Sequence, residues 1–184
     1  MQDLPPQDAP PGIASERLNA AVPTLAALPN VVLVGYPVDG RTRRAVREQM
    51  NARRPASNGQ RHDARTMWRY ATRWQNGPDG NCLLATAEVT VSITVTMPDL
   101  QDPGRLRRED REAWQRNIVG LEHHEANHAR IANLGAEQMQ LAMRAASSCE
   151  DMQAAVVRIS AEVAAASQEY DRRTQHGATE GARF

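Results

Sequence analysis

Three residues of segment 121–131 have the types and spacing of a zinc site: His124, Glu125 and His128 form the pattern H-E-x-x-H. On a helix, residues four apart lie one turn apart on the same face, so both imidazoles can bind one metal ion. The glutamate between them would then act as general base toward a metal-activated water. A solvent-exposed helix rich in His and Glu can contain the same pattern, so the elements that carry it have to be predicted.

The composition narrows the class of protein. The 184 residues include 22 Lys+Arg and 22 Asp+Glu, so the formal net charge is zero and no basic surface for nucleic acid is implied. We expect no membrane span, because no apolar run approaches the roughly 20 residues that a spanning helix needs. The length predicts one domain over 16–184, preceded by a flexible, proline-rich leader over 1–15.

The two cysteines, Cys82 and Cys149, are far apart and lack the C-x-x-C spacing of zinc knuckles and redox motifs. A disulfide between them would place the protein in an oxidising compartment. Two buried free thiols in a cytosolic protein are the alternative. The cysteine pattern by itself leaves both open.

Residues 30–98 predict the sheet half of an α+β domain. Segment 30–38 is rich in β-branched residues, and Thr42 can cap a helix that runs to about Arg54. Apolar and polar residues alternate over 66–74 and over 82–97, on either side of a turn rich in Gly, Asn and Asp. We therefore expect a hairpin extended by the first segment, which gives a small antiparallel β-sheet of about three strands with an N-terminal helix.

Residues 105–184 predict a long antiparallel helix pair, with helices over about 105 or 108 to 146 and about 148 to 173. The motif lies on an apolar stripe of the first helix, with residues spaced by three and four: Trp114, Ile118, Leu121, Glu125, His128, Ala132, Gly135, Met139 and Ala142. Burying three titratable groups costs several kcal/mol unless they are hydrogen-bonded or bind something. A metal ion would satisfy both imidazoles, and an internal hydrogen-bonded network is the alternative.

A catalytic zinc ion commonly has three protein ligands, so the motif needs a partner. A short turn near 147 pairs position 126 with about 168, which brings the segment 169–171 level with the motif. His176 follows directly and is the first choice for the third ligand, with Glu169 and Asp171 as alternatives. His123 points about 100° away from His124 and is a weaker choice.

The order of several segments resembles a known family. These are YPVDGRT (36–42), the strand carrying Trp68 and Trp74, the Cys82 strand ending in TVTMP, LEHHEANH (121–128) and the tail YDRRTQHGATEGARF (170–184). Together they resemble the bacterial domain of unknown function 922, described as a family of inferred secreted zinc-dependent proteases. The resemblance implies a zincin-like metalloprotease, a Cys82–Cys149 disulfide and export to the periplasm or beyond.

The function predicted from these observations is zinc-dependent hydrolysis of peptide bonds in a protein or peptide substrate. His124, His128 and His176 would hold Zn²⁺, Glu125 would be the general base, and Tyr170 would donate a hydrogen bond to the developing oxyanion. One alternative is a metal-binding or structural envelope protein without catalysis. Another is a zinc hydrolase that acts on a non-peptide amide or ester, since the motif specifies activated water and not the acyl group.

Overall fold

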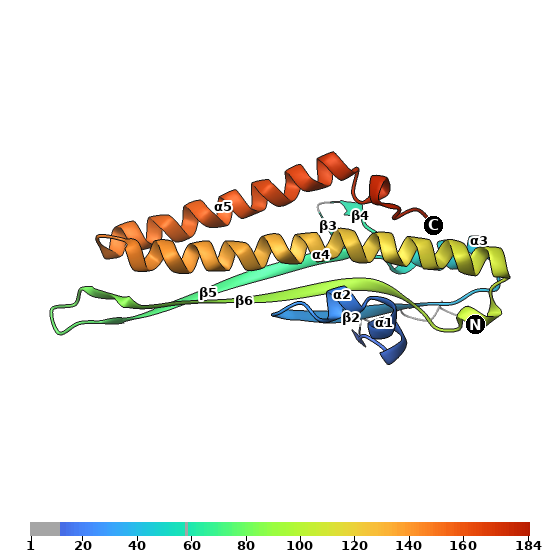
Figure 1. Cartoon of the computed structure of the whole chain (residues 1–184), viewed down its shortest axis with the longest axis horizontal. Coiled ribbons are helices and arrows are strands. Elements are labelled where there is room, and N and C mark those ends of the chain that lie inside the picture. The colour runs from blue at the N-terminus through green and yellow to red at the C-terminus, as the bar shows by residue number, and fades with distance from the viewer. Residues whose placement is uncertain (1–11, 58) are drawn as a thin grey trace, which may run out of the picture.

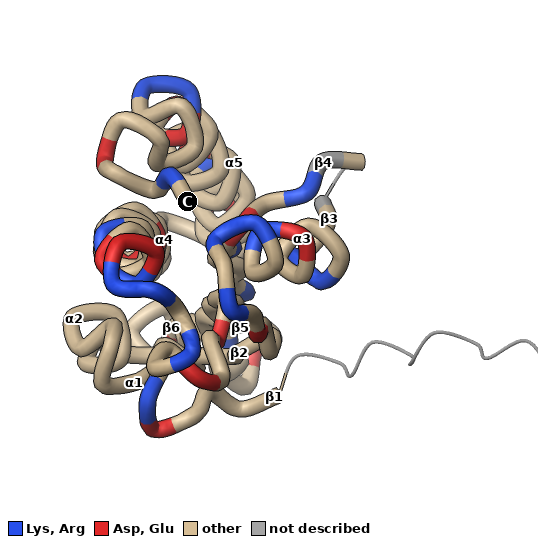
Figure 2. The backbone as a smooth tube through the Cα atoms, turned by 90° about the vertical axis from the view of Figure 1, so that its right-hand side faces the viewer, with Lys and Arg blue, Asp and Glu red and all other residues tan. Residues whose placement is uncertain are grey.

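Two long helices and a four-stranded sheet dominate the computed structural model, which describes residues 12–57 and 59–184 (Figure 1). Helix α4 lies between the sheet and α5, so the elongated α+β fold has three layers (Figures 1 and 2). The strands of the main sheet are β1 (Gly12–Ile13), β2 (Val31–Val38), β5 (Arg65–Asn76) and β6 (Cys82–Leu100). A separate two-stranded ladder consists of β3 (Ala56–Ser57) and β4 (Gln60–Arg61).

The sheet is mixed and has the strand order β1-β2-β6-β5, which corrects the expectation of a three-stranded antiparallel sheet. The predicted hairpin is β5–β6, which pair antiparallel from Arg65↔Thr96 to Asn76↔Cys82. Strand β2 pairs parallel with β6, from Val31↔Ile93 to Val38↔Leu100. The long connection through α3 and the hairpin lets β2 and β6 run in the same direction, which a tight turn would not allow. Of the expected leader, residues 1–11 lie outside the described part, and Gly12–Ile13 add β1 antiparallel to β2.

Three short helices precede or follow β2, and side-chain caps mark where two of them begin. Ser15 caps α1 (Glu16–Ala21), and Thr42 caps α3 (Arg43–Arg53) by accepting a hydrogen bond from the Ala45 N–H. Pro23 occupies the first turn of α2 (Pro23–Ala26), where its missing N–H leaves no donor unpaired. A 3₁₀ turn, η1 (Pro103–Arg105), leads from the sheet into the helical half.

The helical half consists of α4 (Arg108–Ala145) and α5 (Cys149–Thr174), followed by the 3₁₀ turn η2 (Ala178–Glu180). Ser148 caps α5 by accepting from the Asp151 N–H, so the chain reverses within three residues. The two helices therefore run side by side in opposite directions (Figure 1). Ser167 of α5 lies opposite His128 of α4, close to the pairing of 126 with 168 predicted from the turn.

Two apolar clusters hold the layers together. The larger one joins the short helices, the sheet and the first half of α4, and includes Tyr36, Ile93, Met97 and Trp114. The second, rich in methionine, lies where α4 and α5 cover the hairpin; its buried members are Ala87, Met139, Met143, Met152, Ile159 and Val163. Gly135 permits this packing, because a Cβ there would collide with the Val163 side chain and the Tyr70 hydroxyl. None of the described helices combines the length and apolar character needed to cross a membrane.

A disulfide joins Cys82, at the start of β6, to Cys149, at the start of α5. We predict that replacing both cysteines with alanine lowers the free energy of unfolding by about 4 kcal/mol, because the bridge closes a long loop in the unfolded chain. The sequence separation of that loop is 67. Denaturant unfolding of the variant and of the oxidised wild type measures the difference. Equal free energies of unfolding would contradict this role.

Candidate metal centre

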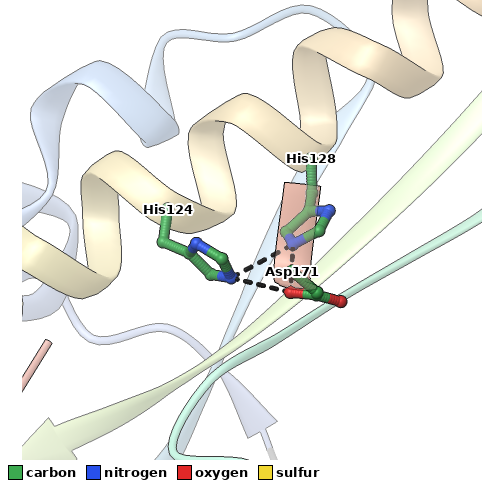
Figure 3. A group of neighbouring side chains, drawn as sticks. All are labelled: His124, His128 and Asp171. Atoms are coloured by element: carbon green, nitrogen blue, oxygen red, sulfur yellow. Dashed lines mark hydrogen bonds and ion pairs between the residues drawn. The ribbon is translucent and has the colours of Figure 1, made fainter. Parts of the chain in front are cut away.

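Three side chains from the two long helices converge on one point (Figure 3). The Nε2 atoms of His124 and His128 lie 3.1 Å apart, and each lies 3.1 Å from Oδ1 of Asp171. Both histidines are buried, and Asp171 is partly exposed. The histidines come from successive turns of α4, and the antiparallel packing of α5 places Asp171 across from them.

The outer nitrogen of each imidazole has its own partner. Nδ1 of His124 lies 2.8 Å from Oε2 of Glu180, and Nδ1 of His128 lies 2.8 Å from the Ser167 hydroxyl oxygen. A carboxylate only accepts hydrogen bonds, so with a metal ion on Nε2 of His124 its Nδ1 would carry the proton and donate it to Glu180. With Nδ1 of His128 donating to Ser167 in the same way, both Nε2 atoms would be free to bind a metal ion beside the Asp171 carboxylate.

In these tautomers the three converging acceptor atoms would repel one another unless a cation or a shared proton lay between them. Two neutral imidazoles and one carboxylate form a donor set that suits Zn²⁺. Tetrahedral zinc with bonds of about 2.0–2.1 Å separates its ligand atoms by about 3.3 Å, close to the spacing of this group. The residues therefore fit a zinc ion, which His124, His128 and Asp171 would hold beside a cavity.

The electrostatics of the group favour a positive charge at this point. Burial lowers the pKa of His124, but Asp171, Glu125 and Glu180 outweigh it, so its pKa is raised overall. Partial burial raises the pKa of Asp171, yet hydrogen bonds with His124 and His128 hold it well below its usual range. Asp171 is thus an anion at neutral pH and attracts positive charge to the two imidazoles.

Glu125 lies between the two histidines in sequence and has its own environment. The residue is 4% exposed, and the Thr66 hydroxyl of β5 lies 2.6 Å from its Oε2. Burial raises the pKa of the Glu125 carboxyl, against the lowering effects of His128 and Thr66. A carboxylate with a raised pKa, fixed by a hydrogen bond, has the properties of a general base.

A cavity of about 760 Å³ opens onto this group. His124, Glu125 and His128 line it on the α4 side, and Asp171 and Ser167 line it on the α5 side. A continuous run of the chain, residues 63–68, that leads into and along β5 also lines it. The cavity is large enough for several residues of a peptide.

The comparisons with known proteins agree with the resemblance noted in the sequence. A family model described as bacterial protein of unknown function (DUF922) matches residues 34–177. The chain belongs to this family. Searches of curated proteins and of solved structures found no match. The matched region of this DUF922 protein spans the sheet, both long helices and the converging group, and ends just beyond His176.

The DUF922 chain brings Asp171, and not His176, into the group with the two motif histidines. His176 lies beside it: its Nδ1 is 3.5 Å from Asp171 Oδ1, and its side chain is 56% exposed and lines the cavity. Glu169, the other alternative, is exposed and pairs with Arg172 through both carboxylate oxygens. Asp171 was reached from the helix register, but the register could not rank it above His176.

Tyr170 is close to the centre but faces away from the cavity. Its ring stacks on His124 at a centroid distance of 5.0 Å, and its hydroxyl donates to Oε1 of Glu180 over 2.6 Å. The Asn127 amide donates to the same hydroxyl oxygen. Tyr170 is absent from the cavity lining, so its placement favours a role in holding Glu180 over the oxyanion role predicted from sequence.

Three residues that contact the site were not predicted: Thr66, Ser167 and Glu180. Each binds a motif residue through a side chain, from β5, α5 and η2 respectively. Thr66 and Ser167 are common residue types with no local signal in the sequence. Glu180 lies within the tail that carries the family resemblance, which was the one available indication of its role.

We predict that Glu180→Ala lowers zinc affinity by about 10- to 100-fold, because it removes the acceptor that orients His124 and fixes its tautomer. Competition with a chromophoric chelator measures the change. Glu162→Ala is the matched control, since Glu162 is exposed on α5 and its carboxylate pairs with Arg158. Equal zinc affinities for the two variants would show that Glu180 does not support the metal ligand.

Proposed function

We propose that this chain is a zinc-dependent metallopeptidase in which His124, His128 and Asp171 hold the metal and Glu125 is the general base. The observation that carries the proposal is the convergence of two Nε2 atoms and one carboxylate oxygen at 3.1 Å spacing. The buried Glu125, between the two histidines in sequence, provides the general base that hydrolysis also needs. Glu125 and the three metal-binding residues line the same cavity.

A bound Zn²⁺ ion supplies Lewis-acid chemistry: it lowers the pKa of a water molecule to about 7 and polarises a carbonyl. Glu125 accepts a proton from the attacking water as the water oxygen bonds to the carbonyl carbon. As the C–N bond breaks, Glu125 delivers that proton to the leaving amine. Thr66 keeps the carboxylate oriented through this transfer by donating to Oε2. The raised pKa of Glu125 helps it to accept and then release the proton near neutral pH.

The shape of the cavity favours a peptide over a small amide or ester. Side chains on a strand alternate between its two faces, so a cavity that contacted one face would be lined by every second residue. All of residues 63–68 line this cavity, which shows that it runs along the backbone of this segment. Strand β5 is the last strand of the sheet, and within 12–57 and 59–184 no strand pairs with its outer edge. Free N–H and C=O groups along such an edge can pair with an extended chain, which recognises a peptide backbone.

The disulfide supports an oxidising compartment as the place of action. Disulfides persist in the periplasm and outside the cell and are rare in the reducing cytosol. The Cys82–Cys149 bridge is therefore consistent with an exported enzyme, in line with the export that the family resemblance implies.

The test is to incubate the protein, loaded with one equivalent of zinc, with a mixed peptide library and to identify products by mass spectrometry. We expect cleavage within peptides, its loss on zinc removal by a chelator, and its return when one equivalent of zinc is restored. Hydrolysis of small esters or amides without peptide cleavage would favour a different hydrolase. Tight zinc binding without any hydrolysis would favour a structural metal protein.

A further inference from the structure

His176 is a cavity residue that the proposed metal ligation leaves unused. It is 56% exposed, lines the same cavity as Glu125, and has Nδ1 3.5 Å from the ligand oxygen of Asp171. His62, from the loop before β5, also lines the cavity and lies beside His176 with the ring centroids 5.5 Å apart. An imidazole that borders a metal ligand and faces the substrate space is well placed to contact a bound substrate.

The backbone around His176 is held in a conformation that L-residues rarely adopt. Gln175, His176 and Gly177 have consecutive positive φ values of 52°, 53° and 80°. Non-glycine residues avoid the left-handed region because Cβ comes too close to the following carbonyl oxygen, and such conformations persist where the surroundings enforce them, often at functional sites.

Contacts with the site enforce this turn. The His176 N–H donates to the Asp171 carbonyl oxygen over 2.9 Å, and the Gly177 N–H donates to the Thr174 hydroxyl. At Gly177 a Cβ would lie 3.0 Å from Cγ of His124, so the turn packs directly on a motif histidine. The position of the His176 side chain is therefore coupled to the position of the metal ligands.

Peptide hydrolysis needs a donor for the carbonyl oxygen as that oxygen gains negative charge. The Tyr170 hydroxyl is engaged by Glu180 and does not line the cavity. The Thr66 hydroxyl already lies against Glu125. Among the donors that line the cavity, His176 contacts the ligand carboxylate of Asp171 without belonging to the three-residue group.

We propose that His176 is a catalytic residue that donates a hydrogen bond from its imidazole to the oxygen of the scissile carbonyl in the transition state. His62 packs against the ring and limits its orientation. This inference rests on the proposed peptidase function, and it assigns to His176 a role in turnover instead of in metal ligation.

The experiment compares His176→Ala with wild type, using the fastest-cleaved peptide from the library and three readouts. We expect kcat to fall by about 10²- to 10³-fold, as for loss of one oxyanion donor. The affinity for a phosphinic peptide, whose tetrahedral anionic group resembles the transition state, should fall by a similar factor in a calorimetric titration. Zinc stoichiometry and affinity should stay unchanged, which shows that the variant is folded and loaded.

Arg158→Ala is the control, because Arg158 is exposed on α5, pairs with Glu162 and does not line the cavity. It should keep kcat and phosphinate affinity within a few-fold of wild type. A loss of zinc from His176→Ala would overturn the inference by making His176 a ligand. Unchanged kcat and phosphinate affinity would overturn it too, while a wild type that cleaves no peptide would remove the proposed function on which it rests.

Discussion

Replacing Glu125 with glutamine should lower kcat for peptide cleavage by about 10²- to 10⁴-fold while zinc stays bound, because the amide cannot accept the proton from water. Glutamine has nearly the same shape, and its carbonyl oxygen can still accept the hydrogen bond that Thr66 donates to Oε2. Zinc content and initial rates, measured on the same preparation, separate the loss of the base from the loss of the metal.

Glu122→Gln provides the control, since Glu122 is also a buried glutamate of α4, three residues earlier. Its Oε1 accepts hydrogen bonds from the Thr24 and Leu25 N–H groups at the start of α2, away from the cavity lining. Glutamine can accept the same two bonds, so this variant should cleave like wild type. Full activity of the Glu125→Gln variant would exclude Glu125 as the general base.

Asp171→Asn should lower zinc affinity by more than about 100-fold, beyond the effect typical of residues that only orient a ligand. The substitution keeps the size of the side chain but removes the negative charge that faces both Nε2 atoms. The change in affinity can be measured by competition with a chelator at constant pH, with circular dichroism as the check on folding.

Two other variants make this test specific to Asp171. Glu169→Gln changes a carboxylate two residues away on α5 whose partner is Arg172, so it should bind zinc like wild type. His176→Ala should also retain zinc if the three-residue group is the whole protein ligand set. A larger loss in His176→Ala than in Asp171→Asn would restore His176 as the third ligand.

Local sequence patterns identified most elements of the fold, but not the direction of every strand. Alternation and turn residues predicted the β5–β6 hairpin, and the apolar stripe predicted α4 together with the burial of its motif. The parallel pairing of β2 with β6 depends on contacts between residues about 60 positions apart, from Val31↔Ile93 to Val38↔Leu100. No turn between them encodes that direction, so the antiparallel prediction failed there.

Within the site, the sequence indicated the helix register more clearly than the ligand set. The short turn between α4 and α5 brought Asp171 level with the motif, but the position of His176 depends on the left-handed turn at 175–177. That turn is stabilised by packing against His124 and by the hydrogen bond to Asp171, which only the folded chain provides. Thr66, Ser167 and Glu180, which orient the motif, lie on β5, α5 and η2 and likewise come together only in the folded chain.

The most direct test of the zinc site is a crystal structure of the protein with one equivalent of zinc, using anomalous scattering at the zinc edge. We expect one anomalous peak about 2.0–2.2 Å from Nε2 of His124, Nε2 of His128 and a carboxylate oxygen of Asp171. A zinc ion bound elsewhere, or no peak between these three side chains, would contradict the proposed centre.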